Sequence, residues 1–172
     1  MPQKSVAHFF LSCPVVSSVL GSGRVRVPTV SKQNFNSATD AEIAFYEALA
    51  RSDLEAMMAV WSEDDEVVCI HPDGARLVGL ANVREAWRQL FSAGVRLAVR
   101  TTQLMANTSM LLTVHSVLEH VSVEGEQNLQ PPLVATNVYM RGAYGWKMVL
   151  HHTSATPEIP EIPNHNNPRT VH

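Results

Sequence analysis

Cysteine is scarce in this chain, and its scarcity excludes a fold held together by disulfides. Only Cys13 and Cys69 occur among the 172 residues, which is too few for a disulfide framework. Cys69 lies in a predicted buried strand, so we expect a reduced, buried, apolar thiol there. At this length one domain can bury a sufficient core without covalent crosslinks.

Several functional signatures are missing as well. The net charge is -3 and no RNP, helix-turn-helix or zinc-finger pattern occurs, so we expect no nucleic-acid partner. The chain has no H-E-x-x-H, C-x-x-C or G-x-S-x-G motif, so we expect no metal, no cofactor and no serine nucleophile. No uninterrupted apolar run reaches the ~20 residues of a membrane span, so we expect no membrane partner.

The two ends of the chain differ in composition from the middle. Residues 1–37 hold four basic and no acidic side chains, which leaves nine basic and 16 acidic residues for the rest. This leader is a targeting segment, a disordered extension, or a stretch that a wrongly assigned start codon has added. The Pro- and Asn-rich tail at 156–172 is predicted to be disordered. We expect a cytoplasmic protein, or an organellar or secreted one if the leader is a targeting peptide.

The domain at 38–155 opens with three predicted helices. Each has an N-terminal pattern in which a side-chain oxygen caps the helix and a glutamate follows three residues later. Apolar residues then recur at helical spacing. The paired positions are Thr39 and Glu42, Ser52 and Glu55, and Asn82 and Glu85.

The second half of the domain changes from helical to alternating periodicity. A short buried strand at 67–70 lies between the second and third helices, and His71 and Pro72 end it. Four longer strands are predicted at 96–106, 110–121, 133–141 and 146–153, with turns at 107–109 and 142–145 and a polar loop at 124–132. A helical half followed by consecutive long strands predicts an α+β fold with an antiparallel meander.

This order of elements resembles the NTF2-like superfamily, especially its SnoaL-like and ketosteroid-isomerase-like members. The matching segments are 45–54 (FYEALARSDL), 58–79 (MAVWSEDDEVVCIHPDGARLVG), 83–91 (VREAWRQLF) and 145–154 (GWKMVLHHTS). The resemblance implies a cone in which three helices pack on a curved, mostly antiparallel sheet. It also implies a pocket at the open end of the cone and frequent homodimers. It implies no single function, because this fold carries many.

His71 is the first candidate catalytic residue. In ketosteroid isomerases the proton-shuttling aspartate ends the corresponding strand, also before a proline, and imidazole can exchange a proton near neutral pH. The alternative is a turn histidine without a chemical role. The isomerase oxyanion hole implies two further candidates, Tyr46 (or Phe45) on the first helix and Asn137 on a late strand. Asn137 can donate a hydrogen bond but cannot be a neutral acid, which argues against steroid isomerisation itself.

The candidate ligand-binding residues are Trp61, Trp87 and His152. The two tryptophans lie on apolar helical stripes, so packing in the core is the alternative for each. His151 and His152 are adjacent and must point to opposite faces of their strand. We expect His152 to point inward, because it shares alternating parity with Trp146.

Two classes of function fit these residues. The first is a pocket for a small apolar or carbonyl-bearing molecule, with isomerase-like or cyclase-like proton transfer. The second is a non-catalytic binding or homo-oligomerisation domain. A catalytic site requires His71 and a second polar group to converge on one point, whereas a scaffold requires only a filled cone.

Overall fold

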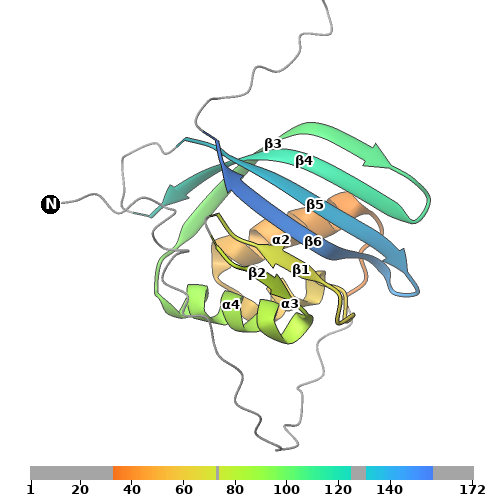
Figure 1. Cartoon of the computed structure of the whole chain (residues 1–172), viewed down its shortest axis with the longest axis horizontal. Coiled ribbons are helices and arrows are strands. Elements are labelled where there is room, and N and C mark those ends of the chain that lie inside the picture. The colour runs from red at the N-terminus through yellow and green to blue at the C-terminus, as the bar shows by residue number, and fades with distance from the viewer. Residues whose placement is uncertain (1–32, 73, 125–130, 157–172) are drawn as a thin grey trace, which may run out of the picture.

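Three helices cover one face of a six-stranded sheet in the computed structural model of the chain (Figure 1). The structure describes residues 33–72, 74–124 and 131–156. Within them, helices α2 (Ala38–Arg51), α3 (Leu54–Val60) and α4 (Leu80–Ser92) pack against the strands through their apolar sides. The α+β fold predicted from the sequence is confirmed. None of these helices is long and apolar enough to cross a bilayer.

The sheet is mixed but mostly antiparallel. Its order is β2-β1-β6-β5-β4-β3, and β1 and β6 form the one parallel pair among the described strands. The long strands β3 to β6 form the predicted meander. The bounds are β1 (Val68–Ile70), β2 (Arg76–Val78), β3 (Leu97–Thr108), β4 (Leu112–Val123), β5 (Leu133–Gly142) and β6 (Gly145–Ala155).

All three helices begin at positions other than the predicted ones. Helix α2 begins at Ala38, because Ser37 and Asp40 form the capping box: Asp40 N–H donates to Ser37 Oγ at 3.0 Å, and Ser37 N–H donates to Asp40 Oδ2 at 3.0 Å. Asp53 caps α3, because Ser52 ends α2 in the left-handed conformation. Helix α4 begins after Gly79, which places the predicted cap Asn82 inside the helix.

The predictions from sequence also missed one strand and misplaced one turn. The three-residue strand β2 was missed, because it is too short to show alternation and lies beyond the Pro-Gly turn that ends β1. The turn between β3 and β4 lies at 109–111 rather than 107–109, and the Ser109 hydroxyl stabilises it by donating to Leu112 O at 2.9 Å. The predicted turn at 142–145 joins β5 and β6 as expected.

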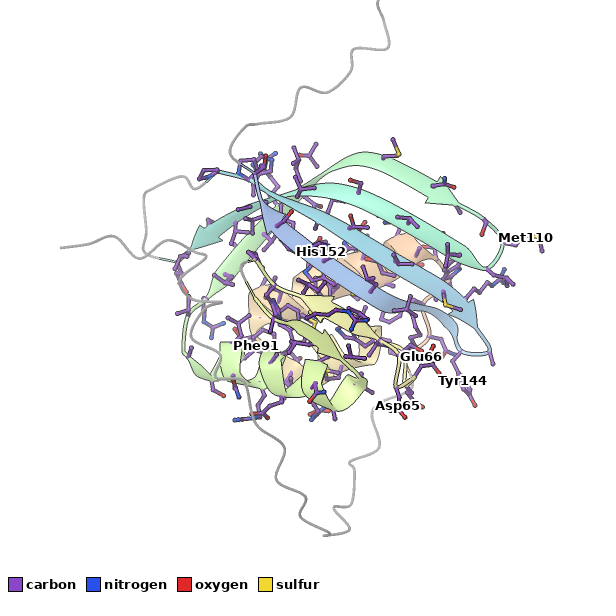
Figure 2. The ribbon with its side chains drawn as sticks, in the orientation of Figure 1. Asp65, Glu66, Phe91, Met110, Tyr144 and His152 are labelled. Atoms are coloured by element: carbon purple, nitrogen blue, oxygen red, sulfur yellow. The ribbon has the colours of Figure 1, made fainter. Side chains whose placement is uncertain are left out.

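A bulge in β6 reverses the predicted orientation of the paired histidines. Tyr139 pairs with Met148 while Val138 pairs with Leu150, so β6 carries one extra residue at Val149. The side chains after this point therefore change face. His151 is buried against the helices and His152 is exposed on the opposite face (Figure 2), which corrects the prediction that His152 points inward.

The domain begins slightly before the compositional boundary near Ser37. Phe35 is buried in the core, and its carbonyl accepts a hydrogen bond from Trp146 N–H at 2.9 Å. Lys147 Nζ donates to Gln33 O at 2.7 Å and so also holds this segment. Residues 1–32 of the predicted leader and 157–172 of the predicted tail lie outside the described residues.

Candidate functional site

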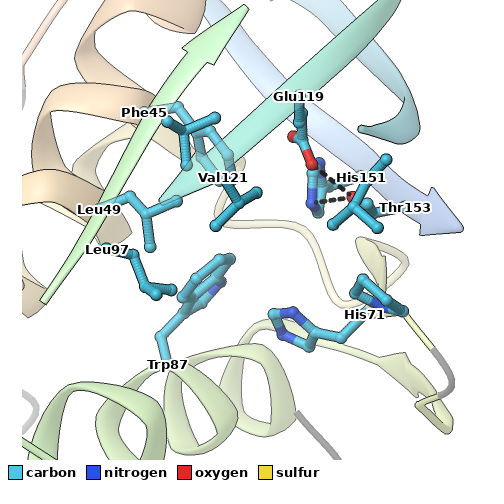
Figure 3. Close-up of a pocket in the computed structure, with 12 residues that line it drawn as sticks. Phe45, Leu49, His71, Trp87, Leu97, Glu119, Val121, His151 and Thr153 are labelled. Atoms are coloured by element: carbon cyan, nitrogen blue, oxygen red, sulfur yellow. Dashed lines mark hydrogen bonds between the residues drawn. The ribbon is translucent and has the colours of Figure 1, made fainter. Parts of the chain in front are cut away.

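A small cleft lies between the helices and the concave face of the sheet (Figure 3). One wall is apolar and includes Phe45, Trp87 and Val121. The other wall carries four polar side chains, His71, Glu119, His151 and Thr153. The cavity volume is about 20 Å³, which is room for about one water molecule. No lysine or arginine is among the described residues that line it.

Glu119 is the central polar residue of the cleft. It extends from the inner face of β4 and is 5% exposed. Its Oε1 accepts a hydrogen bond from the Tyr46 hydroxyl at 2.8 Å, and its Oε2 lies 3.4 Å from Thr153 Oγ1. Burial is the largest influence on this carboxyl group and raises the pKa of Glu119 to about 7, against the opposing hydrogen bond from Tyr46. A carboxyl group with this pKa can both give and take a proton at neutral pH.

Asn137 joins the cleft to a second group of polar side chains behind it. Its Nδ2 donates to Tyr46 Oη at 3.1 Å and to Glu42 Oε1 at 3.0 Å. Its Oδ1 lies 2.7 Å from His151 Nδ1. Although the side chain is fully buried, each end of its amide has a partner, as buried polar groups require.

Glu42 lies at the back of this network. The sequence pattern predicts a capping box of Thr39 and Glu42, but the Glu42 side chain instead points from α2 toward the sheet. Its Oε2 lies 2.9 Å from Nδ1 of His115, which is on the inner face of β4. His120, five residues further along the same strand, is on the opposite face, as the alternation of side chains along a strand requires.

His71 follows β1 directly and lines the cleft. Its Nε2 lies 3.6 Å from Cys69 Sγ, and its ring meets the Trp87 ring edge to face at 4.8 Å. Burial lowers the pKa of His71 to about 4 and that of His151 to about 3. Both rings are therefore neutral at pH 7 and can accept a proton only weakly. Burial also raises the pKa of Cys69 far above neutrality, so its thiol is not a nucleophile.

The predicted site residues fall into three groups. His71 and Trp87 line the cleft. Tyr46 and Asn137 lie behind it and reach it through Glu119 and His151. Trp61 is buried in the core away from the cleft lining, and His152 faces the other side of the sheet.

Sequence reasoning missed Glu119, His151 and Thr153. A signal for Glu119 was present, because the inward positions of its strand alternate through Val117, Glu119 and Val121. A carboxylate at such a position must be buried and partnered. No comparable signal existed for His151 or Thr153, because the bulge that turns them inward leaves no mark in the pattern.

No group of three or more metal-binding side chains gathers among the described residues. The polar side chains of the site instead form hydrogen bonds with one another. What the arrangement offers chemically is a neutral acid or its carboxylate, two neutral imidazoles and a hydroxyl, all facing one small volume.

The match to a family model identifies the chain. The model of the SnoaL-like domain matches residues 39–158. The protein belongs to the SnoaL-like family. Its fold is NTF2-like, as its similarity to solved NTF2-like structures also shows.

Three known proteins are similar to this chain. A candidate calcium/calmodulin-dependent protein kinase type II association domain from Thiobacillus denitrificans is 40% identical, with a TM-score of 0.69, over 72% of this chain and 98% of that one. A candidate dehydratase of the NTF2-like family from Streptomyces avermitilis is 28% identical, with a TM-score of 0.60, over 67% and 91%. F-box protein SKIP8 of Arabidopsis thaliana is 29% identical over 64% of this chain and 46% of its own length, so the match spans less than half of that protein.

Proposed function

We propose that this SnoaL-like domain binds a small, uncharged, carbonyl-bearing molecule in the Glu119 cleft and transfers a proton on it. The observation that carries the proposal is the buried carboxyl group of Glu119, with a pKa of about 7, in a cleft that also contains His71. A general acid or base works best when its pKa is near the working pH. Glu119 would give or take the proton, and the neutral ring of His71 would donate its N–H to the carbonyl oxygen of the substrate.

The lining of the cleft supports an uncharged ligand. Its two histidines are neutral, and no lysine or arginine is among the described lining residues, so a carboxylate or phosphate would be buried without a counter-charge. The indole N–H of Trp87 is buried and has no hydrogen-bond partner among the described residues. A ligand oxygen would supply the missing acceptor.

The relative from Streptomyces is compatible with this proposal. Elimination of water moves one proton from carbon to a base and another from an acid to the leaving hydroxyl. Glu119 could serve in both roles, because its carboxylate can take the proton from carbon and the acid so formed can give a proton to the leaving hydroxyl, which departs as water. The cavity is small, so a ligand larger than water would have to displace side chains of the apolar wall.

Thermal denaturation of the full chain with small ketones, aldehydes and matched carboxylic acids tests the proposal. A ligand at ~100 times its Kd stabilises by about 2.7 kcal/mol. We expect neutral carbonyl compounds to stabilise the protein, and the Glu119→Gln and His71→Ala variants to bind them at least ~10-fold more weakly. His152→Ala is the matched control, because it removes an exposed histidine from the other face and should bind normally.

Two outcomes would contradict this function. Carboxylic acids that bind as tightly as their neutral analogues would remove the charge argument. Absence of any stabilising carbonyl compound, in a protein that unfolds cooperatively, would favour the second candidate.

The second candidate is a homo-oligomerisation domain that pairs two copies through the outer face of the sheet. In the described part of the chain no helix covers this face (Figure 1). Val114, Val138 and Leu150 lie side by side across three strands on it, and Leu112 pairs with Met140 next to them. Such an apolar face, beside the similarity to an association domain from Thiobacillus, favours a homodimer.

Light scattering after gel filtration tests this second candidate. We expect the wild type to have the mass of a dimer and Val138→Glu to shift it toward a monomer, with a Kd at least ~10-fold higher, because a charge would be buried in the interface. Ile43→Glu is the control, since Ile43 is an exposed apolar residue on helix α2. A monomeric wild type at high concentration would exclude this role for the outer face.

A further inference from the structure

The hydrogen bonds behind the cleft form one connected chain, and its direction can be followed from Glu42. The two oxygens of Glu42 lie 3.0 Å from Asn137 Nδ2 and 2.9 Å from His115 Nδ1. Asn137 Nδ2 can only donate. Glu42 Oε1 must therefore accept from Asn137, and Oε2 can accept in the same way from a His115 ring that carries its hydrogen on Nδ1.

The orientation of Asn137 then determines where His151 carries its hydrogen. With Nδ2 directed at Glu42, the Oδ1 atom of Asn137 faces His151 Nδ1 at 2.7 Å and can only accept. His151 therefore donates from Nδ1. The ring is neutral and has a single hydrogen on nitrogen, so its Nε2 must be an acceptor.

The remaining links place a hydrogen on Glu119. Thr153 Oγ1 lies 2.8 Å from the bare His151 Nε2, and the hydroxyl donates its one hydrogen there. The contact of 3.4 Å between Thr153 Oγ1 and Glu119 Oε2 is then a hydrogen bond only if Glu119 donates it. Tyr46 already donates to the other oxygen of Glu119, so a protonated Oε2 completes the chain.

We infer that Glu42 is a positioning residue that holds a proton on Glu119, acting through Asn137, His151 and Thr153. The buried network then keeps its negative charge at Glu42, outside the cleft lining, and presents a neutral carboxylic acid to a ligand. The use of this proton in catalysis rests on the function proposed above. The positions of the hydrogens are a property of the free protein and are tested without a ligand.

The charges around Glu119 agree with this assignment. Burial is the largest cause of its raised pKa, and the negative charge of Glu42 raises it further. The neutral rings of His71 and His151 supply no positive charge to draw the proton away. The titratable groups that face Glu119 or its network are Glu42 and Tyr46 on α2, Cys69 and His71 at β1, His115 on β4, Tyr139 on β5 and His151 on β6.

The first test determines the tautomer of His151 in the full-length wild type by nitrogen-15 NMR of the imidazole rings near pH 6. We expect hydrogen on Nδ1 and none on Nε2, together with a protonated Glu119 side chain in carbon-13 spectra. Hydrogen on Nε2 of His151 would make Thr153 the acceptor from His151 and leave its hydroxyl free to donate to Glu119. This result would overturn the inference. This arm needs no substitution and does not depend on how a variant folds.

The second test titrates Glu119 in the Glu42→Gln variant. Removing the negative charge and freeing Asn137 to rotate should both favour the ionised form of Glu119. We expect its pKa to fall below about 7, while burial, the largest cause of the shift, still holds it above the ordinary value of 4.5. Glu47→Gln is the matched control, because Glu47 is an exposed glutamate on the same helix. An unchanged pKa in Glu42→Gln would overturn the inference, whereas a failed ligand screen would bear only on the proposed function.

Discussion

The Glu119→Gln variant should keep about 3 kcal/mol of unfolding free energy that the wild type loses between pH 4.5 and pH 8. The pKa of Glu119 is raised from 4.5 to about 7 in the folded protein, so folding favours the protonated form. As the pH rises from 4.5 through 7, the unfolded chain loses the Glu119 proton at a lower pH than the folded protein does. Stability therefore falls with rising pH in this window, and glutamine, which cannot ionise, removes the loss.

Urea unfolding at several pH values measures this difference. His71 and His151 act in the opposite sense, because their lowered pKa values make stability fall as the pH drops below 6.5. Both histidines are present in both proteins, so their effect cancels in the comparison. Glu47→Gln should show the wild-type pH dependence. Parallel curves for Glu119→Gln and wild type would mean that Glu119 is already ionised in the folded protein at low pH.

The Gly145→Ala variant should lose about 3 kcal/mol of stability. Gly145 has φ of 82° at the start of β6, where a side chain is strained. A Cβ atom there would also lie 2.4 Å from the carbonyl oxygen of Phe35. That oxygen accepts the hydrogen bond from Trp146 N–H, so moving the Phe35 segment aside would also weaken the bond.

Gly142→Ala is the matched control at the other end of the same turn. Gly142 has no positive φ, and a Cβ atom would meet nothing within 4 Å. We expect its denaturation midpoint in urea to stay close to that of the wild type. Equal destabilisation by the two substitutions would show that the turn itself, rather than the contact between Phe35 and Gly145, is sensitive.

Local pattern was enough to predict the elements of the fold. The helical stripes of α2 to α4 and the alternation in β3 to β6 are properties of short segments, and the structure confirms both. The errors occurred at boundaries, where several residues compete for one role. Ser37 rather than Thr39 caps α2, and Asp53 rather than Ser52 caps α3, because each helix end also depends on the backbone that precedes it.

The candidate site was only partly predictable. His71 was found because its place at the end of a strand before Pro72 is a local feature, and the structure does place it in the cleft. Tyr46 and Asn137 were singled out through family resemblance, and the structure places Asn137 Nδ2 3.1 Å from Tyr46 Oη. Glu119, the acid that contacts Tyr46, was not found, because its partners are 73 residues away on α2 and 34 residues away on β6.

By itself, the sequence determined the α+β class, the family, the buried thiol of Cys69 and the position of His71, since each depends on residues close together in the chain. Only the tertiary structure decided which histidine of the pair at 151 and 152 faces the cleft. One extra residue in β6 exchanges the faces of every side chain that follows, and alternation cannot reveal such a bulge. The raised pKa of Glu119 likewise depends on tertiary structure, because it follows from burial and from groups on other elements.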